Sequence, residues 1–404
     1  MRILLISGEF PPMQGGVGDY TREMARAFTA LGHAVWVLIP KALHAEYADD
    51  RHGEEWQVLA AIRNWRWSCW AQIRAAMAAV RPDVVDIQYQ AAVYDMRNPA
   101  INLLPWRLQR SPERTPVVVT FHDLKPPYLF PKAGQLRTCA IRLLARHSQA
   151  AILTNIEDWA MARAWPFFHE PAGIRRPWFY HIPIGSNIPV APPEGFGRTA
   201  WRAHLGYGPE DFVWAYFGFL NESKGGETLI SALADSPETT HLLMVGGQTG
   251  SSDLTNRAYA DRVEQRIQRL GLGGRVQWTG YVSTEEVSAA LLSADVVVMP
   301  YRDGVSFRRG SLHAALAHGC AIVSTEPRVP LPELVDGENI VLVPPDDPKA
   351  LSRAAQRLHD DSVLRGRIGR GAGVLSRQFA WSEIAMRTVE QVFEPVLSHW
   401  DRTG

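Results

Sequence analysis

Short runs of aliphatic and β-branched residues recur along the chain, and most are followed by a longer segment with apolar residues at helical spacing. Such runs are typical of parallel strands buried on both faces and joined by helical crossovers. The pattern predicts an α/β protein built on doubly wound parallel sheets. The expected strands are 2–7, 34–39, 84–87, 117–120, 150–154 and 181–184 in the first half, and 212–218, 240–246, 276–279, 296–300, 321–324 and 340–343 in the second.

Helices are expected between these strands. The first covers 19–31, with Asp19 as its N-cap and Gly32 as the residue that ends it. A last helical pattern, 381–397, follows the final strand. The other expected helices are 228–234, 255–270, 284–292, 311–317 and 348–358.

The length of 404 residues suits two domains better than one core. A proline-rich stretch near residue 190 interrupts the alternation and reads as a linker. We therefore expect Rossmann-like domains at 1–188 and 199–380, joined by a linker at 189–198. In such sheets, ligands bind outside the carboxyl ends of the strands, which predicts a site in a cleft between two facing domains.

Charge and composition narrow the class of protein. The formal net charge is zero, which argues against a general nucleic-acid binder. Residues 1–190 nevertheless hold 21 Lys and Arg against 16 Asp and Glu. The three cysteines, which are far apart, favour a reducing compartment, and we expect a cytoplasmic protein without a signal peptide or membrane span.

Two segments of the first half, 64–70 and 175–180, mix arginines with large aromatic residues. Surfaces of this kind suit carbohydrate or anionic lipid headgroups, and peripheral membrane contact is one interpretation. The other is that the aromatic rings pack in the core and the arginines are exposed.

Two loops lead into helices in a way that favours anion binding. The segment 8–19 is rich in glycine, which lets a ligand approach the backbone N–H groups at the helix start. The segment 301–325 runs from a polar loop into an alanine-rich helix, with Arg308 and Arg309 directly before it. Helix N-termini and arginines together suit a diphosphate, although glycines and exposed arginines are also common without any ligand.

Eight motifs in order resemble the retaining glycosyltransferases of family 4, which have the GT-B fold of two Rossmann-like domains. The N-terminal signature spans Pro11 to Val37 and includes Gly15, Gly16 and Val17. The remaining motifs are 83–89, 120–123, 182–185, 217–225, 276–280, 294–301 and 332–339.

The resemblance implies transfer of a sugar from a nucleotide-diphosphate sugar to a glycan, a glycolipid or another acceptor, with retention of anomeric configuration. The donor nucleotide would bind the C-terminal domain, and the acceptor would bind mainly the N-terminal one. No metal and no further cofactor are implied. The segment 381–404 would cross back onto the N-terminal domain.

The family's motifs assign roles to single residues. Lys224 matches the lysine that pairs with the donor diphosphate, while Phe219 replaces a second cation. Arg308 and Arg309 are expected to supply the missing charge. His122 matches a histidine that faces the donor sugar, and Asp123 is a candidate to fix its tautomer.

Other positions are expected to bind the donor through the backbone or through small side chains. Two family glutamates fall at Ser306 and Ala314, and neither residue reproduces a carboxylate. Ser306 retains one hydroxyl donor. The expected donor-binding set is Gly15, Gly16, Val17, Gly218, Lys224, Gly280, Tyr281, Val282, Ser306, Phe307, Arg308, Arg309, Gly310 and Ser311.

Three functions remain open from the sequence. A glycosyltransferase is the main interpretation, and a weakened protein of the same fold that binds nucleotide or glycan without efficient transfer is the second, because the two glutamates are missing. A sugar phosphorylase or a nucleotide-sugar epimerase is the third. Nothing in the chain specifically indicates the pyridoxal cofactor that a phosphorylase would need.

Overall fold

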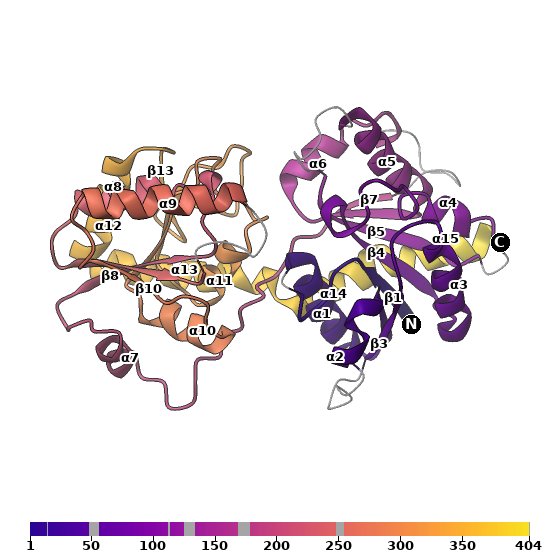
Figure 1. Cartoon of the computed structure of the whole chain (residues 1–404), viewed down its shortest axis with the longest axis horizontal. Helices are drawn as coiled ribbons and strands as arrows, with labels where there is room; N and C mark the ends of the chain where they lie inside the picture. Colours follow the sequence, from indigo (N-terminus) through magenta and orange to yellow (C-terminus); the bar gives the residue numbers. More distant parts are fainter. Residues whose placement is uncertain are drawn as a thin grey trace. The chain divides into compact units, whose positions relative to one another are not determined.

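A computed structural model describes residues 1–13, 15–47, 56–111, 114–124, 134–168, 178–247 and 254–403 of the chain. The chain divides into two compact units, which are shown in Figure 1. Unit 1 comprises Met1–Gly185 and Ala380–Gly404, and unit 2 comprises Ser186–Phe379. The stretch expected to be a linker, 189–198, therefore belongs to unit 2, and the last 25 residues belong to unit 1.

Unit 1 is built on a seven-stranded sheet in the order β3-β2-β1-β4-β5-β6-β7, in which all neighbouring strands are parallel. The order reverses between β1 and β4, so the ligand crevice of this doubly wound sheet is expected at their carboxyl ends. The strands are β1 (Arg2–Ser7), β2 (Ala34–Pro40), β3 (Gln57–Ile62), β4 (Val84–Gln90), β5 (Val117–Asp123), β6 (Ala150–Leu153) and β7 (Trp178–His181).

Alternate residues of β1 bury against helices on opposite faces of the sheet, as a strand with period two requires. Ile3 and Leu5 join the cluster that contains α1 (Gly16–Ala30) and α14 (Trp381–Thr388). Leu4 and Ile6 join the cluster that contains α3 (Cys69–Val80), α4 (Leu104–Leu108) and α5 (Gly134–His147). Short helices α2 (His44–Tyr47) and α6 (Ile156–Ala162) complete the unit, together with the C-terminal α15 (Glu394–Thr403).

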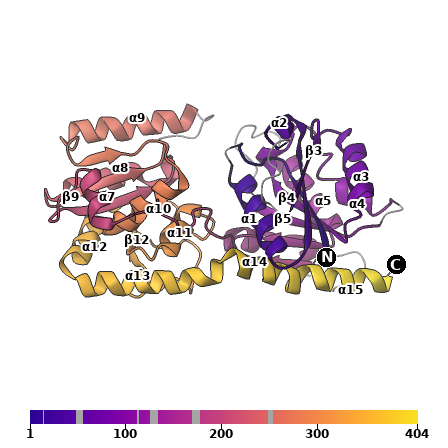
Figure 2. The ribbon, with the colours of Figure 1, turned by 90° about the horizontal axis from the view of Figure 1, so that it is seen from below.

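The end of the chain lies along the same face of unit 1 as α1 (Figure 2). The rings of Tyr20 and Trp381 meet edge to face with centroids 5.3 Å apart, and those of Phe28 and Phe393 are 5.5 Å apart. The expected helix 381–397 is thus α14 followed by a π-helical turn, Val389–Phe393, and α15.

Unit 2 has a six-stranded parallel sheet in the order β10-β9-β8-β11-β12-β13. Here the order reverses between β8 and β11. The strands are β8 (Phe212–Phe217), β9 (Thr240–Val245), β10 (Val276–Trp278), β11 (Val296–Met299), β12 (Ile322–Thr325) and β13 (Val341–Val343). The helices are α7 (Arg198–His204), α8 (Gly226–Ala234), α9 (Leu254–Arg269), α10 (Thr284–Ser293), α11 (Gly310–Ala317), α12 (Pro348–Asp360) and α13 (Ser362–Ser376).

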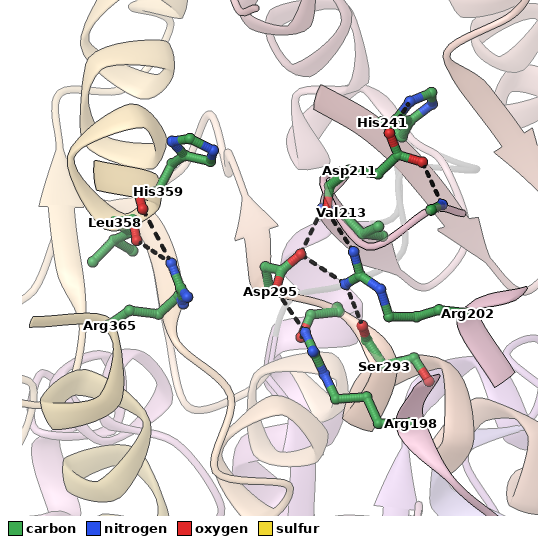
Figure 3. Close-up of polar contacts among 12 residues, drawn as sticks. Arg198, Arg202, Asp211, Val213, His241, Ser293, Asp295, Leu358, His359 and Arg365 are labelled. Atoms are coloured by element: carbon green, nitrogen blue, oxygen red, sulfur yellow. Dashed lines mark hydrogen bonds and ion pairs between the residues drawn. The ribbon is translucent and has the colours of Figure 1, made fainter. Parts of the chain in front are cut away.

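A network of ion pairs holds the amino-terminal edge of the unit 2 sheet (Figure 3). Asp295 accepts hydrogen bonds from Arg198 at 2.6 Å, from Arg202 at 2.8 Å and from the backbone N–H of Val213 at 2.8 Å. Arg202 also donates to the carbonyl oxygens of Ser293 and Asp211. Because Asp295 precedes β11 and Val213 is the second residue of β8, this network lies at the edge opposite to the strands' carboxyl ends and serves the fold.

The two sheets confirm the expected α/β class with two Rossmann-like domains. Several boundaries differ from expectation. The strand β3 was not expected, and β7 covers 178–181 instead of 181–184. Both are edge strands whose residues are mostly half-buried, so neither forms a continuous apolar run. The helix α13 was also not expected, and α1 begins at Gly16 with Gly15, not Asp19, at the N-cap.

Candidate functional site

The corner of unit 2 between β8 and β11 is shaped by two glycines with positive φ. Gly218 follows β8 with φ 116°, and a Cβ there would lie 3.0 Å from Lys224 Nζ and 3.9 Å from Ser311 Cβ. Gly225 has φ 69°, and a Cβ there would lie 1.9 Å from the carbonyl oxygen of Pro300. A side chain at either position is therefore excluded, and the loop after β8 lies directly against the loop after β11.

Lys224 stands beside Gly218 as the last residue of a short 3₁₀ turn, Glu222–Lys224. Burial, together with the positive charge of Arg309, lowers the pKa of its ammonium group to about 8. No ion pair links Lys224 to a carboxylate among the residues that the structure describes, and its charge lies close enough to Arg309 for the two to repel. Two such cations suit an anion between them.

Asp303 binds both arginines that precede α11. Its two carboxylate oxygens lie 2.5 Å from Arg308 Nη2 and 2.5 Å from Arg309 Nη2. The Arg309 guanidinium also lies over the Tyr301 ring, 4.8 Å from its centroid, and donates to the Ser223 hydroxyl at 3.4 Å. Arg308 and Arg309 were expected to supply the charge that is missing at Phe219, and one carboxylate offsets half of their charge. Asp303 was missed because nothing in its spacing indicates this pairing.

The helix α11 begins at this corner without a side-chain cap. Its N-cap is Arg309, whose side chain makes no capping hydrogen bond and whose carbonyl oxygen accepts the N–H of Leu312 at 2.9 Å. The first two N–H groups of the helix, those of Gly310 and Ser311, therefore lie at the corner beside Lys224. Ser311 shares a hydrogen bond of 2.9 Å with the Tyr301 hydroxyl. Gly310 is exposed and leaves the approach to the helix end open.

Other expected donor-binding side chains of the loop lie inside the protein. Ser306 is 2% exposed, and its hydroxyl accepts the backbone N–H of Arg308 at 3.3 Å. Phe307 is 8% exposed and packs against Phe379, with ring centroids 4.7 Å apart. Ala314 is fully buried. Ser306 and Ala314, which stand where the family has its two glutamates, are therefore buried in the packing around α11.

His313 occupies the space next to these positions. Its Nε2 lies 2.7 Å from the carbonyl oxygen of Phe307, and its ring meets that of Phe379 at 4.7 Å. Burial lowers the pKa of His313 to about 4, so the ring is neutral and its Nε2 donates to the carbonyl. Nδ1 has no hydrogen-bond partner among the described residues.

The segment expected to line the base follows β10. Gly280 has φ 70° and forms a bridge with Gly246, while Thr279 Oγ1 accepts the N–H of Gly246 at 3.0 Å. Tyr281 is 75% exposed, and Val282 is half-buried. At the carboxyl ends of β9 and β10, a ligand would therefore meet backbone groups and the exposed ring of Tyr281.

In unit 1, a carboxylate fills the helix start that the sequence assigned to the diphosphate. Glu9 Oε1 accepts the backbone N–H groups of Val17 at 2.9 Å and Gly18 at 3.1 Å. A Cβ at Gly15 would lie 2.1 Å from the same oxygen, so a side chain there would displace this carboxylate. Burial raises the pKa of Glu9 despite these two bonds. Gly16 is exposed, and Gln14 lies outside the described residues.

His122 lies at the end of β5, held by a chain of buried polar groups. Its Nε2 lies 3.1 Å from Gln88 Oε1, and Gln88 Nε2 donates to Asp86 Oδ2 at 2.8 Å. Thr120 donates to the Asp86 carboxylate at 3.0 Å. The expected tautomer partner was Asp123, but Gln88 takes that place because Gln88 and Thr120 are neighbours in the β4–β5 register.

Burial controls the charges of this chain of groups. It lowers the pKa of His122 to about 3, so the imidazole is neutral. It also raises the pKa of Asp86 to about 7, against the lowering effect of Thr120 and Gln88. The Tyr20 ring packs against the His122 ring, with the two centroids 4.6 Å apart. With Nε2–H directed to Gln88, the Nδ1 lone pair of His122 is an acceptor.

The aromatic segments of unit 1 have mixed environments. Trp65 is buried against Tyr94, with ring centroids 4.8 Å apart, whereas Trp67 is 48% exposed. Of the second segment, 175–177 lie outside the described residues and Trp178 begins β7. The interpretation that these aromatic rings pack in the core thus holds for Trp65 and not for Trp67.

The described part of the chain contains neither a membrane-spanning helix nor a cluster of metal-ligating side chains. No helix there is both long and apolar enough to cross a membrane. No group of three or more His, Cys, Asp or Glu side chains is arranged to hold a metal ion within those same residues.

Sequence comparisons match both units. Residues 14–165 match the family model described as Glycosyltransferase Family 4, and residues 211–361 match the one described as Glycosyl transferases group 1. The phosphatidyl-myo-inositol mannosyltransferase of Mycobacterium leprae is 33% identical over 406 residues, covering 98% of this chain and 97% of that protein. The D-inositol 3-phosphate glycosyltransferase of Xylanimonas cellulosilytica is 29% identical over 206 residues, so the match spans 50% of this chain and only 47% of that relative.

Solved structures share the fold. The sucrose-phosphate synthase of Thermosynechococcus elongatus superposes with a TM-score of 0.75 at 22% identity, over 98% of this chain and 99% of that one. The Anabaena protein HepE, crystallised with UDP, gives a TM-score of 0.74 at 18% identity, over 98% and 100% of the two chains.

Proposed function

Because the chain belongs to glycosyltransferase family 4, we propose that it transfers a sugar from a nucleotide-diphosphate sugar to an acceptor hydroxyl, with retention and without a metal ion. The observation that carries the proposal is the cationic corner of unit 2. There Lys224, Arg309 and the uncapped start of α11 meet beside Gly218. These groups suit a diphosphate that gains negative charge as the sugar leaves.

Each group of the corner has a role in this reaction. Lys224 and Arg309 bind the diphosphate as charged donors, and the first N–H groups of α11 bind its oxygens. Arg308 keeps Asp303 in place from the other side and adds positive charge. The exposed Tyr281 and the backbone around Gly280 receive the nucleoside base.

The chemistry follows from retention. The acceptor oxygen attacks the anomeric carbon on the face from which the diphosphate leaves, and its proton passes to a diphosphate oxygen. No protein nucleophile is then required, and catalysis consists of positioning and electrostatic stabilisation. The neutral His122 accepts a hydrogen bond at Nδ1 from a hydroxyl of the transferred sugar.

The acceptor belongs with unit 1 in this proposal. The excess of Lys and Arg in residues 1–190 supports an anionic acceptor, such as the headgroup of a glycolipid, and peripheral contact with a membrane surface. The inositol-containing substrates named for the relatives are the same chemical class.

A second candidate function is nucleotide or glycan binding without efficient transfer. Three observations favour it: Asp303 offsets charge in the donor corner, Ala314 is buried where the family has a glutamate, and Glu9 fills the start of α1.

A panel of UDP-, GDP- and ADP-sugars with EDTA present separates the two candidates. Released nucleoside diphosphate, with or without acceptor, supports the transferase, and NMR of the product reports the anomeric configuration. Binding of a donor without any release for every sugar tested supports the second candidate.

A further inference from the structure

Unit 1 holds a cavity of about 750 Å³ beside the carboxyl end of β4, apart from the groups described above. Its volume falls in the roughly 300–1,000 Å³ range of small-molecule sites. One wall comes from the segment between β4 and α4, and the other from the first half of α5. The apolar side chains of these walls are Met96, Pro99, Leu103, Leu136, Ile141 and Leu143.

Several polar side chains of the cavity wall already have partners within the protein. The Tyr89 hydroxyl accepts from Asn102 Nδ2 at 2.8 Å, and the Tyr94 hydroxyl donates to the carbonyl oxygen of Gln88 at 2.8 Å. Asp95 accepts from Arg66 Nε at 2.9 Å and from the N–H of Arg97 at 3.0 Å. A sugar would find few unused partners here, whereas a hydrocarbon chain needs none.

Two arginines line the cavity, the exposed Arg97 and the half-buried Arg137. The cavity's acidic residue, Asp95, is already paired with Arg66. The helix α5 carries three arginines and no acidic residue. Leu136, at the start of this helix, is 76% exposed. A largely apolar cavity that is also lined by two arginines is complementary to a molecule with a hydrocarbon chain and an anionic head.

We propose that this cavity holds the hydrocarbon chain of an anionic amphiphile, with its headgroup against Arg97 and Arg137. This amphiphile is the acceptor of the transferred sugar. The acceptor role rests on the proposed glycosyl transfer, while occupancy of the cavity does not.

Cys139 provides a direct readout because it is exposed and lines the cavity. Burial raises the pKa of the other two thiols, to about 11 for Cys69 and about 12 for Cys320, so a maleimide reacts first at Cys139. The probe is palmitoyl-lysophosphatidylglycerol below its micelle concentration. The comparison probes are palmitoyl-lysophosphatidylcholine and glycerol 3-phosphate.

The anionic amphiphile is expected to slow labelling of Cys139 by roughly 10-fold or more at saturation, and glycerol 3-phosphate is expected to leave the rate unchanged. Ala140 also lines the cavity, so Ala140→Trp is expected to fill it and to remove the protection. Ala78→Trp, on the exposed face of α3, retains it. Thermal unfolding verifies that both variants are folded.

Three results would overturn the proposal: no protection at any concentration below micelle formation, equal protection in Ala140→Trp, or equal protection by glycerol 3-phosphate. Equal protection by the zwitterionic amphiphile would overturn the assignment of an anionic headgroup.

Consumption of a donor sugar by the wild type and by Ala78→Trp separates this inference from the proposed function. Donor consumption without protection of Cys139 contradicts the cavity proposal alone. Protection without consumption of any donor supports occupancy and contradicts the transferase.

Discussion

The Oε1 atom of Gln88 lies 3.1 Å from Nε2 of His122. The amide orientation follows from the other end of the side chain, where Nε2 of Gln88 donates to the buried carboxylate of Asp86 at 2.8 Å. Gln88 therefore fixes the His122 tautomer with its proton on Nε2 and its lone pair on Nδ1. We assign Gln88 a positioning role and His122 a role in contact with the sugar.

Gln88→Leu removes this constraint and is expected to lower kcat by roughly 10-fold, or about 1.4 kcal/mol, with a smaller effect on donor KM. The ¹⁵N NMR signals of His122 should change from one tautomer to a mixture. Since burial lowers the pKa of His122 to about 3, no titration of this ring is expected between pH 5 and 9 in the wild type. An unchanged tautomer in Gln88→Leu would refute the positioning role.

The lowered pKa of Lys224 predicts how donor binding depends on pH. Burial, and then Arg309, lowers its pKa to about 8 in the unbound protein. As the pH rises through this value, Lys224 loses its charge, so a diphosphate must bind together with a proton. Donor affinity is expected to fall by up to about 10-fold per pH unit above pH 8.

Lys224→Arg keeps its charge throughout this range and should remove the dependence. Titration calorimetry with nucleoside diphosphate from pH 6.5 to 9.5 measures both proteins. The same slope in the wild type and in Lys224→Arg would assign the titration to another group.

The carboxylate of Asp303 is expected to weaken donor binding. Asp303→Asn frees Arg308 and Arg309 from their shared carboxylate and raises the net charge of the cluster by one. Nucleoside diphosphate should then bind roughly 3- to 10-fold more tightly at low salt, and the gain should shrink as ionic strength rises.

Asp346→Asn is the matched control, because Asp346 pairs with Arg302 on the exposed surface at 2.9 Å. Its φ of 56° is one that asparagine also adopts. Weaker binding in Asp303→Asn than in this control would show that Asp303 orders the arginines for the ligand instead of competing with it.

The ion pairs of Asp295 lead us to expect that unit 2 loses stability at acidic pH. Burial by itself would raise the pKa of Asp295, but the N–H of Val213 and the guanidinium groups of Arg202 and Arg198 outweigh it and hold the pKa below its usual value. A depressed carboxyl pKa contributes stability above the unfolded value of about 3.9, and this stability is lost as the pH falls through the folded value.

Asp295→Asn leaves Arg202 buried without its carboxylate and is expected to cost about 3–5 kcal/mol at pH 7. The difference from the wild type should narrow below pH 4. Urea unfolding at pH 7 and pH 3 provides both values, and a constant difference across pH would contradict the assignment.

The fold was largely predictable because buried parallel strands leave continuous apolar runs in the sequence. The runs beginning at Arg2 and Phe212 correspond to β1 and β8. The exceptions are the edge strands β3 and β7, whose half-buried residues carry no such signal. The start of α1 was misplaced because Glu9 caps it from outside the helix.

Residues of the candidate site were predictable only where they lie in a loop directly after a strand. Lys224, Arg308 and Arg309 were predicted as donor-binding residues of the loops that follow β8 and β11, and these two loops do meet. Asp303 and Gln88 were not, because their importance depends on which oxygen faces which nitrogen in three dimensions. The β4–β5 register places Gln88 beside Thr120 and within reach of His122, and this was the signal that could have identified Gln88.

The most direct test of the account is donor turnover by the wild type, Lys224→Arg and Lys224→Ala, all measured with EDTA. If cationic side chains bear the charge of the leaving diphosphate, the wild type turns over without metal and Lys224→Ala loses roughly 100-fold or more in kcat, about 3 kcal/mol. Lys224→Arg should retain much of the rate. Full turnover by Lys224→Ala, or wild-type turnover that stops with EDTA, would contradict the account.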